Sequence, residues 1–120
     1  IELNKDAVRD ARINASDNHI SNAEFVNADA SEYISEMADE GMQADVIFMD
    51  PPRSGSTEVF MSSAVKLAPR TIVYISCGPE SLKRDLEHLT KHGYKVQKLQ
   101  PVDMFPQTVH VETVVLLTKK

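Results

Sequence analysis

The chain has 120 residues, enough for one domain with its own hydrophobic core and too few for two. Apolar residues make up 42% of the sequence and charged residues 26%, as in a folded globular domain, and no apolar run is long enough to span a bilayer. The net charge of −5 argues against a domain that binds nucleic acid mainly by neutralising phosphates, and the single cysteine excludes an internal disulfide or a cysteine-cluster metal site.

The predicted elements alternate between short apolar strands and amphipathic helices along the whole chain. Apolar periodicity predicts four strands and four helices in alternation: strands at residues 1–3, 23–28, 44–49 and 71–76, and helices at residues 4–18, 31–40, 57–67 and 79–93. Two further strands, at residues 95–102 and 111–118, have no helix between them, so we expect them to pair antiparallel at or near a sheet edge. The pattern indicates an α/β fold with a mostly parallel sheet covered by helices on both faces.

Four polar or reactive residues follow successive predicted parallel strands: Glu2, Asp29, Asp50 and Cys77. In an open α/β sheet, ligands bind beyond the carboxyl ends of the parallel strands, so these residues indicate one binding edge. A carboxylate at Glu2 suits the two hydroxyls of a ribose, and one at Asp29 suits an amine of a purine. Each of these two also has a simpler interpretation, as a solvated turn residue or a helix cap.

The Asp-Pro-Pro-Arg segment at residues 50–53 is a more specific motif. Its two prolines hold the chain extended and leave carbonyls facing a cleft where a planar base or an amino group can lie. A rigid turn without a ligand is the alternative. Arg53 suits a phosphate or a carboxylate, or only a partner at the surface.

The single cysteine lies between a predicted strand end and a predicted helix start, in Ser-Cys-Gly-Pro at residues 76–79. Amide dipoles at a helix start favour the thiolate, which is the form that attacks electrophiles. Gly78 beside the thiol is expected to let a substrate approach the backbone closely. An inert cysteine in the core is the alternative, because cysteine is often buried.

The loop before the last predicted strand contains His110 and, two residues later, Glu112. Glu112 alternates with Val111 and Thr113, so periodicity alone predicts a glutamate at the surface. The three other histidines lie at helix ends or on polar helix faces and are expected to be solvated.

Three motifs, taken together, resemble the catalytic domain of RNA uracil-C5 methyltransferases that use S-adenosylmethionine. They are Asp-Pro-Pro-Arg-Ser-Gly at residues 50–55, Ser-Cys-Gly-Pro at residues 76–79 followed by Leu-Lys-Arg-Asp-Leu at residues 82–86, and Met-Phe-Pro at residues 104–106 followed by His-Val-Glu-Thr at residues 110–113. Their order and spacing match the family over essentially the whole chain, most closely the bacterial enzymes that make 5-methyluridine in ribosomal or transfer RNA. The resemblance implies a Rossmann-like methyltransferase fold with a C-terminal antiparallel strand.

The resemblance also implies roles for individual residues. C5 of uracil is too weak a nucleophile to take a methyl group unaided, so a thiolate first adds to C6, C5 then takes the methyl, and a base removes the C5 proton before the thiolate leaves. In the family motifs Cys77 is the nucleophile and Glu112 the base, which replaces the surface interpretation of Glu112. The cofactor contacts correspond to Glu2, Asp29 and Asp50, and a stacked target base would have to be turned out of the RNA.

Relative to the family pattern, the first strand and its glycine-rich turn are missing before Ile1, as is an RNA-binding module. We therefore interpret residues 1–120 as part of a methyltransferase catalytic domain, and we expect this fragment alone to bind S-adenosylmethionine weakly or not at all and to have no catalytic turnover. The expected partner of the full-length protein is ribosomal or transfer RNA. The sheet edge left by the missing strand favours self-association.

Two other functions stay open at this point. Asp-Pro-Pro followed by an aromatic residue is typical of methyltransferases that modify amino groups of adenine or glutamine, although Arg53 takes the aromatic position here. A non-catalytic folding module is the other alternative. In every case we expect no bound metal, no membrane attachment and a cytoplasmic location.

Overall fold

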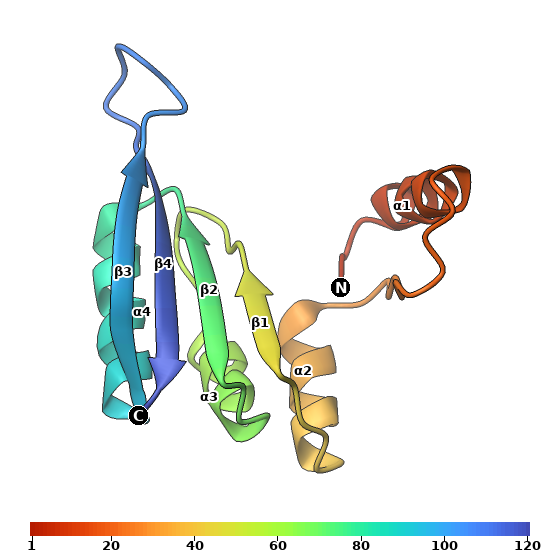
Figure 1. Cartoon of the computed structure of the whole chain (residues 1–120), viewed down its shortest axis with the longest axis horizontal. Coiled ribbons are helices and arrows are strands. Elements are labelled where there is room, and N and C mark those ends of the chain that lie inside the picture. Colours follow the sequence, from red (N-terminus) through yellow and green to blue (C-terminus); the bar gives the residue numbers. More distant parts are fainter.

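A computed structural model describes all residues from 1 to 120 (Figure 1). The helices and strands follow one another in the order α1 (Lys5–Asp17), α2 (Ala30–Asp39), β1 (Val46–Met49), α3 (Glu58–Lys66), β2 (Thr71–Ser76), α4 (Pro79–Lys91), β3 (Tyr94–Val102) and β4 (Glu112–Lys119). All four predicted helices and the last four predicted strands are confirmed within a few residues. None of the helices has the length and apolar character needed to cross a membrane.

The four strands form one mixed sheet in the order β1-β2-β4-β3. β1 and β2 are parallel, and β4 lies antiparallel between β2 and β3. The predicted antiparallel pairing of the last two strands is confirmed, with β3 at the sheet edge. Inserting β4 between β2 and β3 brings the loop that precedes β4 to the carboxyl end of β2.

The strands predicted at residues 1–3 and 23–28 are present only as an isolated parallel bridge between Glu2 and Asn27. Two backbone hydrogen bonds form it, from Glu2 N to Val26 O at 2.9 Å and from Ala28 N to Glu2 O at 3.2 Å. The prediction of full strands was wrong because no other strand of this chain pairs with the two segments, and a ladder needs continuous pairing. α1 and these segments stand beside the sheet beyond β1 (Figure 1).

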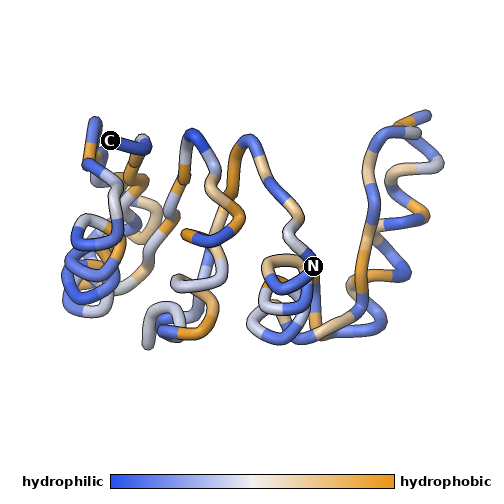
Figure 2. The backbone as a smooth tube through the Cα atoms, turned by 90° about the horizontal axis from the view of Figure 1, so that it is seen from below, coloured by the Kyte–Doolittle hydropathy of each residue, from blue (hydrophilic) through white to orange (hydrophobic).

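The helices α2, α3 and α4 all lie on one face of the sheet (Figures 1 and 2). On that face, α3 and α4 pack against alternate residues of the strands in a cluster of Met49, Met61, Ile72, Tyr74, Leu82, Leu89, Tyr94, Val115 and Leu117. The intervening strand residues face the other side, where Phe48 is 73% exposed. The expectation of helices on both faces was therefore wrong for the residues of this chain, because α1 stands at the side and covers neither face of β2 or β4.

Candidate active site

A pocket of about 570 Å³ opens beside the carboxyl ends of the parallel strands β1 and β2. It is lined by residues from three segments that are far apart in the sequence: Arg53 and Ser54 after β1, Cys77, Gly78, Pro79, Glu80, Ser81 and Arg84 after β2, and Val109 and His110 before β4. This is the sheet edge at which ligands bind in open α/β folds. The three motifs of the sequence therefore meet in one place.

Cys77 comes directly after β2 and two residues before Pro79, where α4 begins. The residue is half-buried, lines the pocket and is absent from the hydrophobic core cluster. Gly78 is the N-cap of α4 and has no side chain with which to cap the first amides of the helix. The positive end of the helix dipole therefore lies next to the thiol.

The turn that carries Cys77 is held by two serines. The hydroxyl of Ser76 accepts from Gly78 N at 3.1 Å and lies 3.0 Å from Gly78 O, and Ser81 Oγ lies 3.0 Å from the same carbonyl. A Cβ atom on Gly78 would lie 2.8 Å from the carbonyl oxygen of Arg53. Gly78 therefore lets the loop after β1 approach the turn. Because Gly78 also lines the pocket, the expectation that it lets a substrate approach the backbone stays a prediction.

Glu112 begins β4 and lies at the pocket end of the β2–β4 ladder. The last pair in that ladder is Ser76 with Thr113, so Cys77 and Glu112 are the next residues beyond it on the two segments. Glu112 is half-buried while Thr113 is buried, in agreement with the alternation read from the sequence. The side chain of Glu112 is not among those that line the pocket.

The three carboxylates predicted to bind a cofactor lie outside the Cys77 pocket, and all three are exposed. Asp29 caps α2, because one of its oxygens accepts from Ser31 N at 2.8 Å and Glu32 N at 3.1 Å. Glu2 accepts from Asn4 N at 2.7 Å, which closes a local turn. Asp50 accepts no hydrogen bond.

Each of these carboxylates keeps at least one oxygen free. Glu2 and Asp29 each use a single oxygen in their local hydrogen bonds, and both oxygens of Asp50 are free. Free carboxylate oxygens fit the hydroxyl and amine donors of a nucleoside. The capping role of Asp29 and its predicted binding role are therefore compatible.

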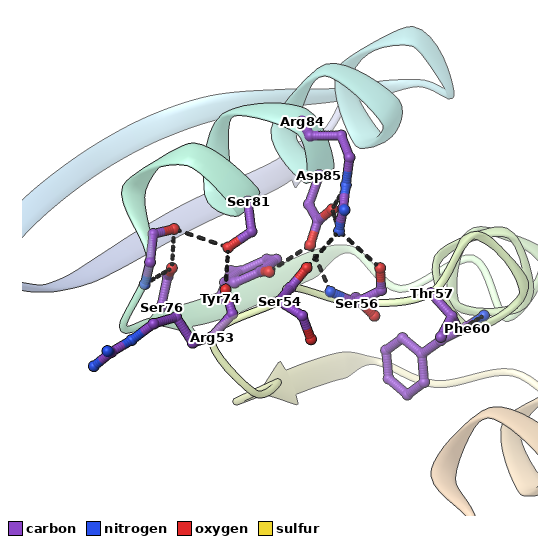
Figure 3. Close-up of polar contacts among 11 residues, drawn as sticks. Arg53, Ser54, Ser56, Thr57, Phe60, Tyr74, Ser76, Ser81, Arg84 and Asp85 are labelled. Atoms are coloured by element: carbon purple, nitrogen blue, oxygen red, sulfur yellow. Dashed lines mark hydrogen bonds and ion pairs between the residues drawn. The ribbon is translucent and has the colours of Figure 1, made fainter.

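The structure contains a buried polar network beside the pocket that the sequence analysis did not predict. Asp85 of α4 is fully buried and accepts from the hydroxyl of Tyr74 at 2.6 Å and from Ser56 N at 2.7 Å (Figure 3). Arg84 donates to the other carboxylate oxygen from Nε at 2.9 Å. Burial and the hydrogen bond to Asp85 raise the pKa of Tyr74 far above its usual value. The sequence signal was an aspartate three residues after Leu82 and four before Leu89, within the apolar stripe of α4.

The fold is that of S-adenosylmethionine-dependent methyltransferases. Precorrin-6y C5,15-methyltransferase from Geobacter metallireducens superposes with a TM-score of 0.75 over 98% of this chain and 66% of that protein, at 19% identity. The tRNA (uracil-54, C5)-methyltransferase of Pyrococcus abyssi, solved with S-adenosyl-L-homocysteine, superposes with a TM-score of 0.81 and 33% identity over 97% of this chain and 27% of that one.

The family follows from a match over the whole sequence. Residues 1–120 match the family model of tRNA (uracil-5-)-methyltransferases, and the chain belongs to that family. An uncharacterised RNA methyltransferase of Clostridium tetani is 42% identical over 98% of this chain. The chain spans 26% of the length of that relative.

Proposed function

We propose that the protein in which this chain occurs transfers a methyl group from S-adenosylmethionine to C5 of a uridine in RNA. The observation that carries the proposal is the position of Cys77: a half-buried thiol at the start of α4, lining a pocket at the carboxyl ends of the parallel strands. Family membership and the similarity to a tRNA uracil C5-methyltransferase support the same reaction.

In the proposed site, Glu2, Asp29 and Asp50 hold the cofactor through their free carboxylate oxygens. The cofactor, when bound, supplies an electrophilic methyl group. The pocket beside Cys77 holds the target uracil, turned out of the RNA so that its C6 can reach the thiol.

The proposed reaction begins with the thiolate of Cys77. It forms a bond to C6 of the uracil, and the electron pair of the C5–C6 double bond moves into an enolate, which makes C5 nucleophilic. After C5 has gained the methyl group, Glu112 takes the proton from C5. The electron pair of the C5–H bond re-forms the double bond and the Cys77–C6 bond breaks, which returns the thiolate. Both residues come directly beyond the last β2–β4 pair, Ser76 with Thr113, and this closeness along the ladder supports the division of roles.

The test uses the complete protein in which this chain occurs and RNA that contains 5-fluorouridine. Because fluorine at C5 cannot be removed as a proton, we expect a covalent protein–RNA adduct that survives denaturing electrophoresis and whose RNA-linked peptide contains Cys77. Cys77→Ala should form no adduct and lose at least about 1,000-fold in methyl transfer. Glu112→Gln should still form the adduct and should accumulate it even with ordinary uridine.

His92→Gln, at the exposed far end of α4, serves as the control and should behave as the wild type. Methyl transfer by Cys77→Ala at the wild-type rate would exclude the cysteine adduct and would favour methylation of an amino group. An adduct peptide without Cys77 would also contradict the assignment.

A further inference from the structure

The loop between β1 and α3, residues 50–57, makes very few backbone hydrogen bonds of its own. Pro51 and Pro52 have no amide hydrogen, and the backbone hydrogen bond inside the loop runs from Gly55 N to Pro52 O at 2.8 Å. Yet this loop begins with Asp50 and contributes Arg53 and Ser54 to the pocket wall. Its conformation must therefore be set by contacts with another element.

That element is α4, through Ser81, Arg84 and Asp85, which we call the α4 clamp (Figure 3). Ser81 Oγ lies 2.8 Å from Arg53 O. Arg84 Nη2 donates to Ser54 O at 3.0 Å and to Ser56 O at 3.1 Å, and Asp85 accepts from Ser56 N at 2.7 Å. Four polar groups of the loop backbone, within residues 53–56, are thus bound by residues 81–85 of α4.

The α4 clamp packs closely against the backbone of the loop at Gly55. Gly55 has a φ of +84°, and a Cβ atom there would lie 2.5 Å from Arg84 Nη2 and 2.7 Å from Asp85 Oδ2. Only glycine adopts this backbone readily and leaves room for both side chains. A side chain at position 55 would therefore push the loop away from Arg84 and Asp85.

Asp85 is fully buried, and a buried carboxylate costs stability unless every oxygen is paired. Here both oxygens are paired, one with Tyr74 and Ser56 and the other with Arg84. An apolar residue would pack against the core at this position without that requirement, but it would not bind the loop backbone. The placement of a charge in the apolar stripe of α4 is therefore explained by what it holds.

The α4 clamp also fixes the position of the loop relative to the thiol of Cys77. α4 begins at Pro79, two residues after Cys77, and Ser81 lies within hydrogen-bond distance of both Arg53 O and Gly78 O. We infer that Asp85, with Arg84, is a positioning residue that sets the spacing between the Asp50–Arg53 segment and Cys77. This inference rests on the proposed function, in which the first segment serves the cofactor and the thiol attacks the base.

The test compares Asp85→Asn with the wild type in the complete protein. Asparagine keeps the shape but has one acceptor oxygen, so it cannot accept from Ser56 N and from Arg84 at once. We expect hydrogen exchange of peptides covering residues 53–57 to be at least tenfold faster, while the peptides of β2 and α4 exchange as in the wild type. Alkylation of Cys77 by iodoacetamide should become severalfold faster, because the loop no longer forms a fixed pocket wall.

In the methylation assay, Asp85→Asn should lower kcat at least tenfold and raise the KM for the cofactor, because the loop carries Asp50. Tyr94→Phe is the matched control, since it removes a buried hydroxyl bonded to Pro69 O at 2.8 Å, outside the pocket and its clamp, and should leave kcat unchanged. If Asp85→Asn does not fold, Arg84→Met replaces it, because the side chain of Arg84 is 59% exposed and its loss removes the bonds to Ser54 O and Ser56 O.

Two results would overturn the inference: unchanged exchange of residues 53–57, or a loosened loop with kcat within twofold of the wild type. Failure of the proposed function is seen separately, as a wild-type protein that neither methylates RNA nor forms an adduct with 5-fluorouridine. Exchange and alkylation need no substrate. They therefore decide whether the clamp holds the loop even if the reaction differs.

Discussion

Tyr74 and Tyr94, two buried tyrosines of the sheet, differ in the group that accepts the hydrogen bond of their hydroxyls. The hydroxyl of Tyr74 donates to the carboxylate of Asp85, and that of Tyr94 donates to the neutral carbonyl of Pro69. Burial raises the pKa of both tyrosines, and the hydrogen bond to Asp85 raises that of Tyr74 further. A hydrogen bond to a charged group is the stronger of the two kinds.

We expect Tyr74→Phe to lower the free energy of unfolding by about 2 kcal/mol and Tyr94→Phe by about 1 kcal/mol, measured by urea denaturation at pH 7. Because folding raises the pKa of Tyr74, its contribution is complete below the ordinary tyrosine pKa of about 10 and is lost as the pH rises above it. The difference between wild type and Tyr74→Phe should therefore shrink above about pH 10. Equal losses for the two variants at pH 7 would contradict the role of Asp85.

At the scale of the element, the helices begin where the sequence provides a cap. Asn4, Asp29 and Thr57 each accept backbone amides at the starts of α1, α2 and α3. α4 is the exception: its N-cap is glycine, and its first turn faces the pocket instead of a capping side chain. The helix beside the proposed nucleophile is therefore the one of the four that has no side-chain cap.

Asp29 allows the capping role and the proposed binding role to be separated. Asp29→Asn keeps an oxygen for the amides of Ser31 and Glu32, so stability should stay within about 0.5 kcal/mol, whereas Asp29→Ala should lose about 1 kcal/mol. We also expect Asp29→Asn to weaken cofactor binding by the complete protein at least fivefold in calorimetry. If Asp29→Asn binds the cofactor with wild-type affinity, the role of Asp29 is limited to capping α2.

At the scale of the whole molecule, the two ends of the sheet differ. β3 forms one edge and carries Lys95 and Lys98, charges of the kind that discourage pairing with another chain. β1 forms the other edge and has no charge, with Val46 44% and Phe48 73% exposed. Next to β1, the strand residues that alternate with the core cluster, such as the paired Val73 and Leu116, belong to the face that no helix of this chain covers.

We expect residues 1–120, expressed as such, to self-associate through β1 and the adjoining bare face. Sedimentation velocity should show an average mass that rises with protein concentration, and Phe48→Lys should suppress the rise because it places a charge at the edge. Val59→Lys is the control, since it changes an exposed apolar residue on the helical face and should leave the association intact. A single monomeric species for the wild type at all concentrations would contradict the prediction.

The sequence by itself determined the local elements and the motifs. Helix caps, apolar periodicity and the two prolines after β1 act over a few residues, so they could be read without the fold, and the helices and last four strands were predicted on that basis. The place of the thiol at a strand end was predicted for the same reason, because Cys77 stands between a β-branched run and a proline.

Only the tertiary structure decided how those pieces meet. Local periodicity does not show which strands pair. Residues 1–3 and 23–28 have strand patterns but form one bridge, and the start of β4 comes to the carboxyl end of β2 only because β4 inserts beside β2. The α4 clamp is likewise set by approach across a loop, since Asp85 reaches Ser56 29 positions away in the chain. Such contacts depend on where elements pack, and packing joins residues that no short-range pattern connects.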